Sequence, residues 1–276
     1  MISPISASDK AKYAAARRAV DFIENGMNVG LGSGSTAAWM VRCLGTVIKN
    51  TDLHVTAVAT SAQTAALAHE VGIIVRPFDD ISALDLTIDG ADECDQHLNL
   101  IKGGGGALLR EKIVAAASNR MIVIADASKQ VDVLGQFALP VEIIPFGQSA
   151  TQVWIRNKLS ELGYADHTIR LRRQKSNNER PFQTDEGNFI LDLHLAHIDN
   201  PYDLHRELNQ IPGIVENGLF LDMCDTVIIG HANGTVEMRE NPNAVIGHDR
   251  NPTSIAPQTA GHGRQQTQAA LNGKSS

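Results

Sequence analysis

Short apolar runs alternate with helical patterns along the first half of the chain. Apolar residues recur at helical spacing over residues 8–25, with Ser8 placed to cap the start and Gly26 to stop the end. Six apolar runs follow, at 28–31, 54–59, 73–75, 84–88, 98–101 and 121–125, and helical patterns such as 36–44 and 63–70 separate them. Nearly continuous apolar strands are typical of a parallel sheet covered on both faces. The pattern predicts an α/β domain with a doubly wound, mostly parallel sheet.

The order of elements changes at about Leu139. Strand, helix, two strands, helix and strand follow at 141–144, 149–162, 168–172, 188–194, 202–209 and about 213–220. This β-α-β-β-α-β order predicts a smaller, ferredoxin-like α+β domain. The polar stretch 173–185 is unusually long for a hairpin loop, and we expect it to be mobile. A last strand at 226–229 is predicted to return to the main sheet.

These changes divide the chain into three parts. We expect residues 1–136 and 221–240 to form the catalytic domain, and residues 137–220 to form a domain inserted within it. Residues 241–276 are polar, rich in Pro, Gly and Gln, and without period. That composition predicts a disordered tail.

Composition and charge exclude several classes of protein. The 276 residues carry a net charge of −7, which makes nucleic acid an unfavourable partner. The three cysteines contain no CxxC pair, and the ten histidines show no metal-ligand spacing. We see neither a signal peptide nor an apolar run of about 18 residues that could span a membrane. The expectation is a cytoplasmic protein without a membrane, nucleic-acid or metal partner.

A loop of glycines and hydroxyls follows the first predicted strand. It includes Ser33, Gly34, Ser35 and Thr36, and it opens a helix whose free N–H groups can bind an anion. A dinucleotide fingerprint would need glycine at position 35 and an acidic residue at the end of the next strand, where Thr60-Ser61 stands instead. A phosphate monoester suits these hydroxyls better, although a dinucleotide and a purely structural turn remain alternatives.

Two further polar segments follow predicted strands. The first is an acidic turn, and the second is a lysine with four glycines leading into a predicted helix at 107–117. Four successive glycines cost backbone entropy, which indicates a close approach of the backbone to a ligand. Singly, each polar side chain could be a turn residue or a solvated charge, but together at one sheet edge they indicate a site. The candidates are Asp89, Gly90, Ala91, Asp92, Lys102, Gly103, Gly104, Gly105 and Glu111.

The order of these motifs resembles the type A ribose-5-phosphate isomerase family over about residues 10–232. The segments that carry the likeness are GLGSGSTA, DLTIDGADECD, LIKGGGGALLREKIVA, IADASKQVDVLG, LPVEIIPFG and TDEGNFILDLHL. The resemblance implies a Rossmann-like domain with an inserted α+β domain, a homodimer or higher homo-oligomer, and no cofactor. This sequence departs from the family in having Gly106 where alanine is common, Leu109 where threonine is frequent, and a longer 173–185 loop and tail.

The same resemblance implies a reaction and roles for individual residues. The reaction is the interconversion of ribose 5-phosphate and ribulose 5-phosphate through an enediolate, in the non-oxidative branch of the pentose phosphate pathway. Glu111 matches the catalytic base, and Asp89, Asp92 and Lys102 match the polar group of the active site. The loop 33–36 matches the phosphate site, Lys129 another substrate contact, and Lys12 a weaker phosphate contact. Between the aspartates, we expect Asp89 to assist ring opening and Asp92 to orient Lys102 or a sugar hydroxyl.

Three other functions fit the architecture less well. An amino-sugar phosphate isomerase-deaminase would release ammonia from glucosamine 6-phosphate. A sugar-phosphate sensor would favour an attached helix-turn-helix and would tolerate loss of the base, whereas Glu111 and its neighbours are present. A dinucleotide-dependent reductase is possible on fold alone.

Overall fold

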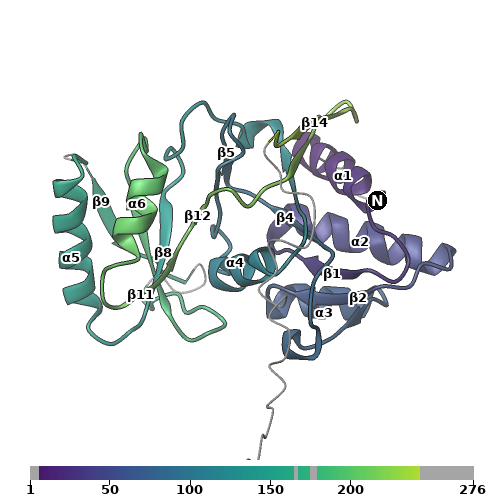
Figure 1. Ribbon diagram of the computed structural model, residues 1–276, viewed down its shortest axis with the longest axis horizontal. Coiled ribbons are helices and arrows are strands. Elements are labelled where there is room, and N and C mark those ends of the chain that lie inside the picture. Colours follow the sequence, from purple (N-terminus) through teal and green to yellow (C-terminus); the bar gives the residue numbers. More distant parts are fainter. Residues whose placement is uncertain (1–5, 165–166, 175–178, 243–276) are drawn as a thin grey trace, which may run out of the picture.

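The computed structural model describes residues 6–164, 167–174 and 179–242, and its largest element is a seven-stranded sheet (Figure 1). The sheet order is β14-β13-β7-β4-β1-β2-β3, in which every pairing is parallel except that of β14 with β13. Read from β3, the parallel strands run 3-2-1-4-5-6 in chain order, which is the order of a Rossmann-like sheet. The bounds are β1 (Asn28–Leu31), β2 (Thr56–Ala59), β3 (Ile74–Val75), β4 (Leu86–Gly90), β7 (Met121–Asp126), β13 (Thr226–Gly230) and β14 (Val236–Glu240). The predicted fold class is confirmed, including the return of the last predicted strand.

Helices cover both faces of this sheet. Along β7, Ile122 and Ile124 join one core cluster with residues of α1, α2 and α3, while Val123 and Ala125 join another that includes a residue of α4. The bounds are α1 (Ala7–Val20), α2 (Gly34–Asn50), α3 (Ala62–Glu70) and α4 (Leu108–Ala116). Alternate residues of one strand therefore enter separate cores, which explains why the strands are almost wholly apolar in sequence.

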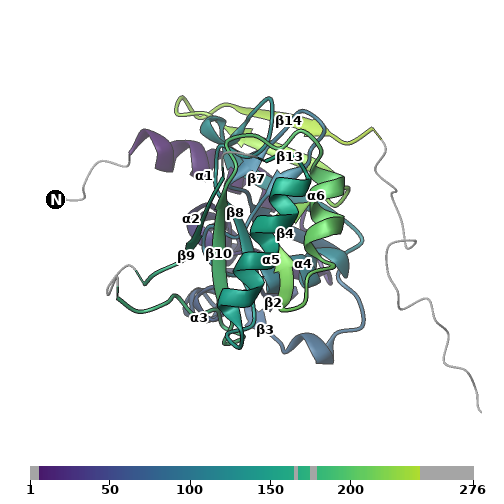
Figure 2. The same ribbon diagram turned by 90° about the vertical axis from the view of Figure 1, so that its left-hand side faces the viewer.

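The smaller sheet has four strands in the order β11-β8-β10-β9, all antiparallel. Helices α5 and α6 pack against it through Ile155, Leu159, Leu204 and Leu208 (Figure 2). The bounds are β8 (Leu139–Ile143), α5 (Gln148–Glu161), β9 (Thr168–Leu171), β10 (Phe189–His194), α6 (Pro201–Leu208) and β11 (Ile214–Asn217). This is the predicted β-α-β-β-α-β order, and the domain boundaries assigned to it stay a prediction.

A third sheet between the other two corrects one prediction. The run 98–101 is not a strand of the main sheet: only β6 (Leu100–Ile101) is extended, and it pairs antiparallel with β5 (Glu93–Cys94) and β12 (Leu219–Phe220). The chain reverses before β6 because Leu98 has a positive φ of 62° and the Asp95 carboxylate accepts hydrogen bonds from two backbone N–H groups. The predicted strand at 213–220 is likewise two strands, β11 and β12, in different sheets.

Other boundaries also differ from the predictions. The first helix ends at Val20 rather than at residue 25. The prediction was too long because Phe22 and Ile23 continue the apolar pattern, although they pack on the core from a position beyond the helix. The edge strand β14 was not predicted, since its residues are mostly exposed. The tail prediction lies almost wholly outside the described residues, as do residues 175–178 of the predicted loop. Within the described ranges, every helix is too short or too polar to cross a membrane.

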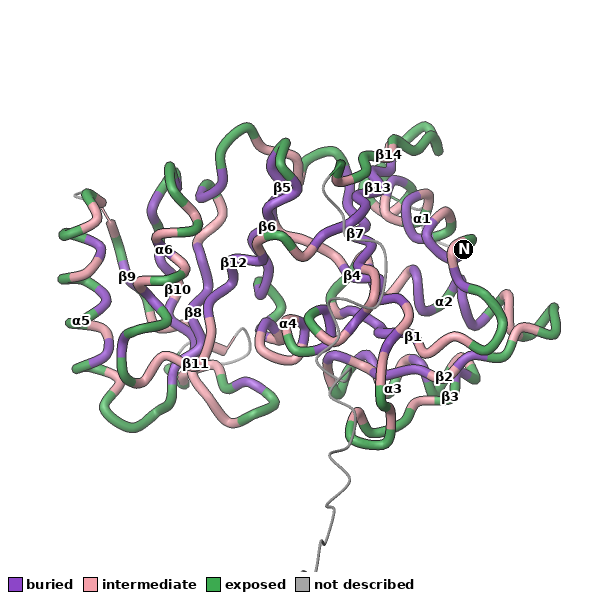
Figure 3. Tube along the Cα trace, in the orientation of Figure 1, coloured by how far each residue is buried: buried purple, intermediate pink, exposed green. Residues whose placement is uncertain are grey.

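The core at the centre of the molecule gives a stability prediction. Phe220 is fully buried on β12, in a segment that Figure 3 colours as buried. The ammonium nitrogens of Lys102 and Lys112 lie 5.3 and 4.9 Å from its ring centroid. We expect Phe220→Ala to lower the free energy of unfolding by about 3–5 kcal/mol, because it opens a cavity. Val133→Ala alters a loop side chain that is 46% exposed and should change it by no more than about 0.5 kcal/mol. Urea denaturation of both variants measures the contrast, and equal losses would contradict it.

Candidate active site

A cleft opens where the strand order of the main sheet reverses, between β1 and β4. In open α/β sheets this is where the loops after two strands part and leave room for a ligand. The cleft has a volume of about 140 Å³. It is lined by Lys12, residues 33–36, residues 90–92, residues 102–105, Glu111 and Lys129, the last from the short 3-10 helix η2 (Ala127–Lys129). Apart from Asp89, every residue predicted for the site lines this one cleft.

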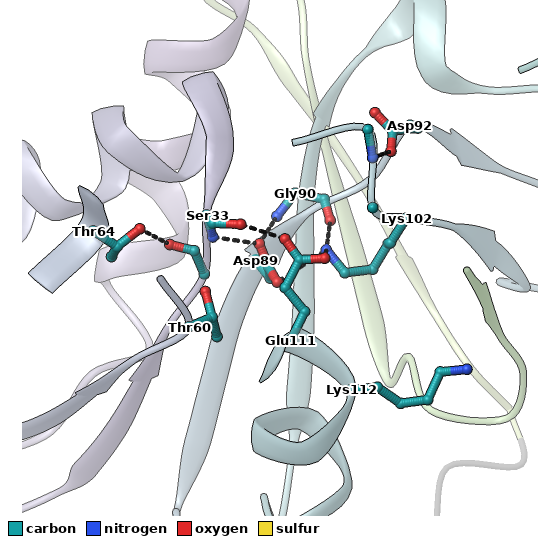
Figure 4. Close-up of polar contacts among 12 residues, drawn as sticks. Ser33, Thr60, Thr64, Asp89, Gly90, Asp92, Lys102, Glu111 and Lys112 are labelled. Atoms are coloured by element: carbon teal, nitrogen blue, oxygen red, sulfur yellow. Dashed lines mark hydrogen bonds and ion pairs between the residues drawn. The ribbon is translucent and has the colours of Figure 1, made fainter. Parts of the chain in front are cut away.

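A buried ammonium group holds two carboxylates beneath the cleft (Figure 4). Lys102 Nζ lies 2.9 Å from Asp89 Oδ2 and 3.3 Å from Glu111 Oε2, and it donates a 2.6 Å hydrogen bond to the carbonyl of Gly90. The three charged side chains are at most 4% exposed. An unpaired charge at such depth costs several kcal/mol, so each of these groups depends on the others for its ionised form.

The cluster contains one positive and two negative groups. Burial and the charges of the cluster together shift the pKa of Asp89 and the pKa of Lys102. Burial raises the pKa of Asp89 to about 7, against the opposing attraction of Lys102. Burial acts to lower the pKa of Lys102, but the attraction of Asp89 and Glu111 outweighs it and raises this pKa above its ordinary value. Lys102 therefore stays an ammonium ion, while the raised pKa of Asp89 lets this carboxyl gain a proton near neutral pH.

Glu111 is the carboxylate of the cluster that reaches the cleft. It lies in the first turn of α4, and the hydroxyl of Ser33 donates a short hydrogen bond to its Oε1. Among the described residues, no hydrogen-bond donor is assigned to Oε2, which has only the ion pair with Lys102. One oxygen of Glu111 is thus held by Ser33, while the other has only the ammonium group of Lys102 beside it among the described residues.

Asp89 lies below the cleft rather than in its wall. Its side chain is fully buried, and its Oδ1 accepts hydrogen bonds from the N–H groups of Ser33 and Gly90, at 3.0 and 2.7 Å. Gly32 makes room for it, because a Cβ at that position would lie 2.1 Å from Asp89 Oδ1. Asp89 therefore joins the loop after β1 to Lys102.

The start of α2 forms the anion-binding wall. Ser33 stands at the N-cap, yet its side chain makes no capping hydrogen bond because the hydroxyl contacts Glu111 instead. The first N–H groups of the helix are therefore open to the cleft, and the helix dipole favours an anion there. Lys12 reaches across from α1, where its Nζ donates a 3.1 Å hydrogen bond to Ser35 Oγ.

The glycine run forms the opposite wall together with Asp92. The N–H of Gly104 donates a 2.7 Å hydrogen bond to Asp92 Oδ2, and burial raises the pKa of this carboxyl. A Cβ on Gly104 would lie 2.5 Å from Asp92 Oδ1, so the close approach depends on glycine. The cleft thus has N–H donors at the start of α2 and in the glycine run, and the Asp92 carboxylate also lines it.

The two hydroxyl residues that stand where a dinucleotide site would have an acidic residue have structural roles. Thr60 is fully buried and donates to the carbonyl of Leu31, while Ser61 caps α3 by accepting from the N–H of Thr64. Neither lines the cleft.

Arg172 also contacts the site, because it donates a hydrogen bond to the carbonyl of Gly103. It was not predicted from sequence, since its position after a strand carried no motif. Within the described residues there is no cluster of three metal-ligating side chains.

Comparisons with known proteins agree on one family. Residues 56–234 match the family model described as ribose 5-phosphate isomerase A (phosphoriboisomerase A). A ribose-5-phosphate isomerase A of Jannaschia sp. is 58% identical over 250 residues, which cover 91% of this chain and 94% of the relative; that of Ruegeria pomeroyi is 56% identical with the same coverage.

Solved structures agree with the sequence relatives. A D-ribose-5-phosphate isomerase in complex with phospho-erythronic acid is 40% identical, with a TM-score of 0.76 over 84% of this chain and 99% of the other. The ribose 5-phosphate isomerase of Plasmodium falciparum is 34% identical, with a TM-score of 0.77 over 83% of this chain and 97% of the other.

The buried cluster predicts a pH-dependent loss of stability on removal of Lys102. We expect Lys102→Met to lower the free energy of unfolding by about 3–5 kcal/mol at pH 8, because the carboxylates lose their cation. Without Lys102 the pKa of Asp89 rises further, so the carboxyl is protonated at pH 5.5 and the loss becomes smaller there. Lys49→Met, at an exposed lysine, is the control. Urea denaturation at both pH values tests this, and a loss that grows as the pH falls would contradict it.

Proposed function

The chain belongs to the ribose 5-phosphate isomerase A family and interconverts ribose 5-phosphate and ribulose 5-phosphate, and we propose that Glu111 moves the proton in this reaction. The observation that carries the proposal is the geometry of Glu111. Its carboxylate faces the cleft, one oxygen is held by Ser33, and the other lies beside Lys102. Few side chains combine burial, a fixed orientation and an oxygen able to accept a proton.

The reaction needs one carboxylate acting twice. In the open-chain aldose, Glu111 takes the proton from C2, and the electrons of that C–H bond form the C1–C2 double bond of an enediolate while the carbonyl oxygen O1 becomes negative. Glu111 then returns a proton to C1. The hydroxyl on C2 becomes the carbonyl as its proton passes to O1, so the atoms balance without an oxidant or reductant.

The developing charge on the oxygens needs donors that are oriented in advance. Lys102 is fixed by three oxygen atoms, and the N–H groups of the glycine run line the same wall of the cleft. Donors aimed at a transition-state oxygen lower the barrier because they need little reorganisation during the reaction. We assign Lys102 and the amides of Gly103 and Gly105 to this role, because the N–H of Gly104 is already donated to Asp92.

The placement of the two aspartates favours the reverse of the division expected from sequence. Asp89 is buried under the cleft and contacts Lys102, so it orients the ammonium group. Asp92 lines the cleft with one carboxylate oxygen held by Gly104. We therefore assign ring opening or contact with a sugar hydroxyl to Asp92, and the positioning of Lys102 to Asp89.

The phosphate occupies the start of α2 in this proposal. The open N–H groups of residues 34–36, the hydroxyls of Ser35 and Thr36, and Lys12 all face that end of the cleft, and Lys129 adds a second cation. Binding energy from this remote group holds the reacting carbons beside Glu111. The ligand of the 40% identical relative supports this arrangement, because phospho-erythronic acid carries a phosphate at one end and a planar carboxylate resembling an enediolate at the other.

The setting of the enzyme is also a proposal. We propose that it works in the cytoplasm, in the non-oxidative branch of the pentose phosphate pathway, without cofactor or metal. We also propose a homodimer or higher homo-oligomer. Four large apolar side chains support this assembly, since Ile144, Phe146, Val153 and Trp154 are all more than 40% exposed in the small α+β unit.

Replacement of the base tests the function. We expect Glu111→Gln to lower kcat about 10²–10⁴-fold, because the amide cannot accept the proton. Its affinity for phospho-erythronic acid should stay within about threefold of wild type, because the isosteric amide leaves the donors in place. Formation of ribulose 5-phosphate from ribose 5-phosphate, with EDTA and no added cofactor, is the assay. Glu70→Gln, at an exposed position, is the control. Near-normal turnover by Glu111→Gln would remove Glu111 from the role of base.

Removal of Lys12 tests the phosphate site. We expect Lys12→Met to raise KM for ribose 5-phosphate about tenfold with a smaller change in kcat, because one charge-assisted contact is lost away from the reacting carbons. Lys10→Met alters an exposed lysine of the same helix and should leave both constants unchanged. Steady-state kinetics would contradict the assignment if the two variants behaved alike.

A further inference from the structure

Arg172 joins the small α+β unit to the glycine run of the active site. It follows β9, and its Nη1 donates hydrogen bonds to the carbonyls of Gly103 and Gly104, at 2.8 and 3.4 Å. Its Nε and Nη2 bind the two carboxylate oxygens of Asp192 at 3.0 and 2.5 Å. The guanidinium is therefore fixed on one edge by Asp192 while another edge faces the glycine peptides.

The planarity of the peptide bond carries the effect of Arg172 into the cleft. In a trans peptide the C=O of one residue and the N–H of the next share a plane and point in opposite directions. The Gly103 carbonyl faces Arg172, and the Gly104 N–H of the same peptide faces Asp92, 2.7 Å away. The Gly104 carbonyl likewise shares a plane with the N–H of Gly105, a residue that lines the cleft. A donor outside the cleft thus fixes the direction of two donors inside it.

Glycines cannot fix these directions by themselves. A run of four has no side chains to restrict its dihedral angles, and each residue has access to positive as well as negative φ. Gly103 and Gly106 both have positive φ, and the Gly106 N–H donates to the Gly103 carbonyl at 2.9 Å. The Gly103–Gly104 peptide is thus held at its carbonyl by Gly106 and at its N–H by Asp92, and Arg172 adds a second donor to that carbonyl. Among the contacts of the described residues, the Gly104 carbonyl has Arg172 as its donor.

Phe182 lies against the same glycine run. Phe182 packs so near Gly106 that a Cβ there would lie 2.4 Å from the ring. The Phe182 N–H donates to the carbonyl of Arg172 at 2.8 Å, and the guanidinium lies 5.9 Å from the ring centroid. The aromatic ring and the guanidinium thus cover the glycine run from the small unit.

We propose that Arg172 is a positioning residue of the isomerase, which orients the N–H groups of Gly104 and Gly105 by binding the carbonyls on the other side of their peptides. The proposal rests on the proposed function in one respect, namely that the Gly105 amide serves the oxygens of the enediolate while the Gly104 amide holds the Asp92 carboxylate. Arg172 itself touches no substrate. The role needs a fork-shaped donor, because a lysine cannot bind both oxygens of Asp192 and a glycine carbonyl in the same geometry.

The test compares Arg172→Ala with Arg172→Lys. Arg173→Ala is the matched control, because Arg173 is the exposed neighbour and its guanidinium donates to the carbonyl of Glu179. We expect kcat of Arg172→Ala to fall about 10- to 100-fold, less than on loss of a direct oxyanion donor, with KM changed less than kcat. Guanidinium chloride at sub-denaturing concentration should restore part of kcat in Arg172→Ala, while sodium chloride at the same ionic strength should not. A merely structural role would not respond to the planar cation.

Each outcome decides for or against the proposal. Wild-type kcat in Arg172→Ala or in Arg172→Lys overturns it, and so does a folded, impaired Arg172→Ala that guanidinium fails to restore. If thermal unfolding shows that Arg172→Ala is not folded, Arg172→Lys decides: a loss of kcat with an unchanged melting temperature supports the role, and wild-type kcat removes it. Turnover by Glu111→Gln would instead show that the base is wrongly assigned, a result that leaves the effect of Arg172 on kcat unaltered.

Discussion

The ion cluster of Lys102 with Asp89 and Glu111 is the interaction on which the active site depends. A lysine that is 3% exposed can stay charged only beside anions, and these carboxylates can stay ionised only beside it. The cluster joins three elements, because Asp89 lies near the end of β4, Lys102 follows β6 and Glu111 lies in the first turn of α4. One interaction therefore fixes the base, its neighbouring cation and the carboxylate below them.

The three sheets have distinct parts in holding this cluster. The main sheet brings the loops after β1 and β4 together at its switch point, and Asp89 binds the N–H of Ser33 across it. The central three-stranded sheet anchors Lys102, whose N–H donates to the Gly218 carbonyl and whose ammonium lies near Phe220. The small sheet supplies Arg172, so the glycine run is held from the side opposite the cleft. The site consequently depends on all three sheets.

Much of this could be predicted from sequence, for reasons that particular segments illustrate. The alternation of buried strands and helices determined the fold class, and the acidic turn and the lysine–glycine run follow strands, so their residues meet in one cleft. The run 98–101 was misplaced because a short apolar run does not reveal which sheet it joins. The roles of Asp89 and Asp92 depend on which carboxylate lies under the cleft, and two aspartates three residues apart carry no such signal. Arg172 was missed because its contact with Gly103 joins residues 69 positions apart.

A crystal structure of this protein with phospho-erythronic acid would test the central claim most directly, since the ligand carries both the phosphate and a planar mimic of the reacting carbons. The account predicts the phosphate at the start of α2 beside Lys12, and the carboxylate against Lys102 and the amide of Gly105. The Glu111 carboxylate should lie within about 3.5 Å of the carboxyl end of the ligand, as a near-attack geometry requires. A ligand bound with its carboxylate at α2, or bound with Glu111 out of reach of that end, would contradict the account.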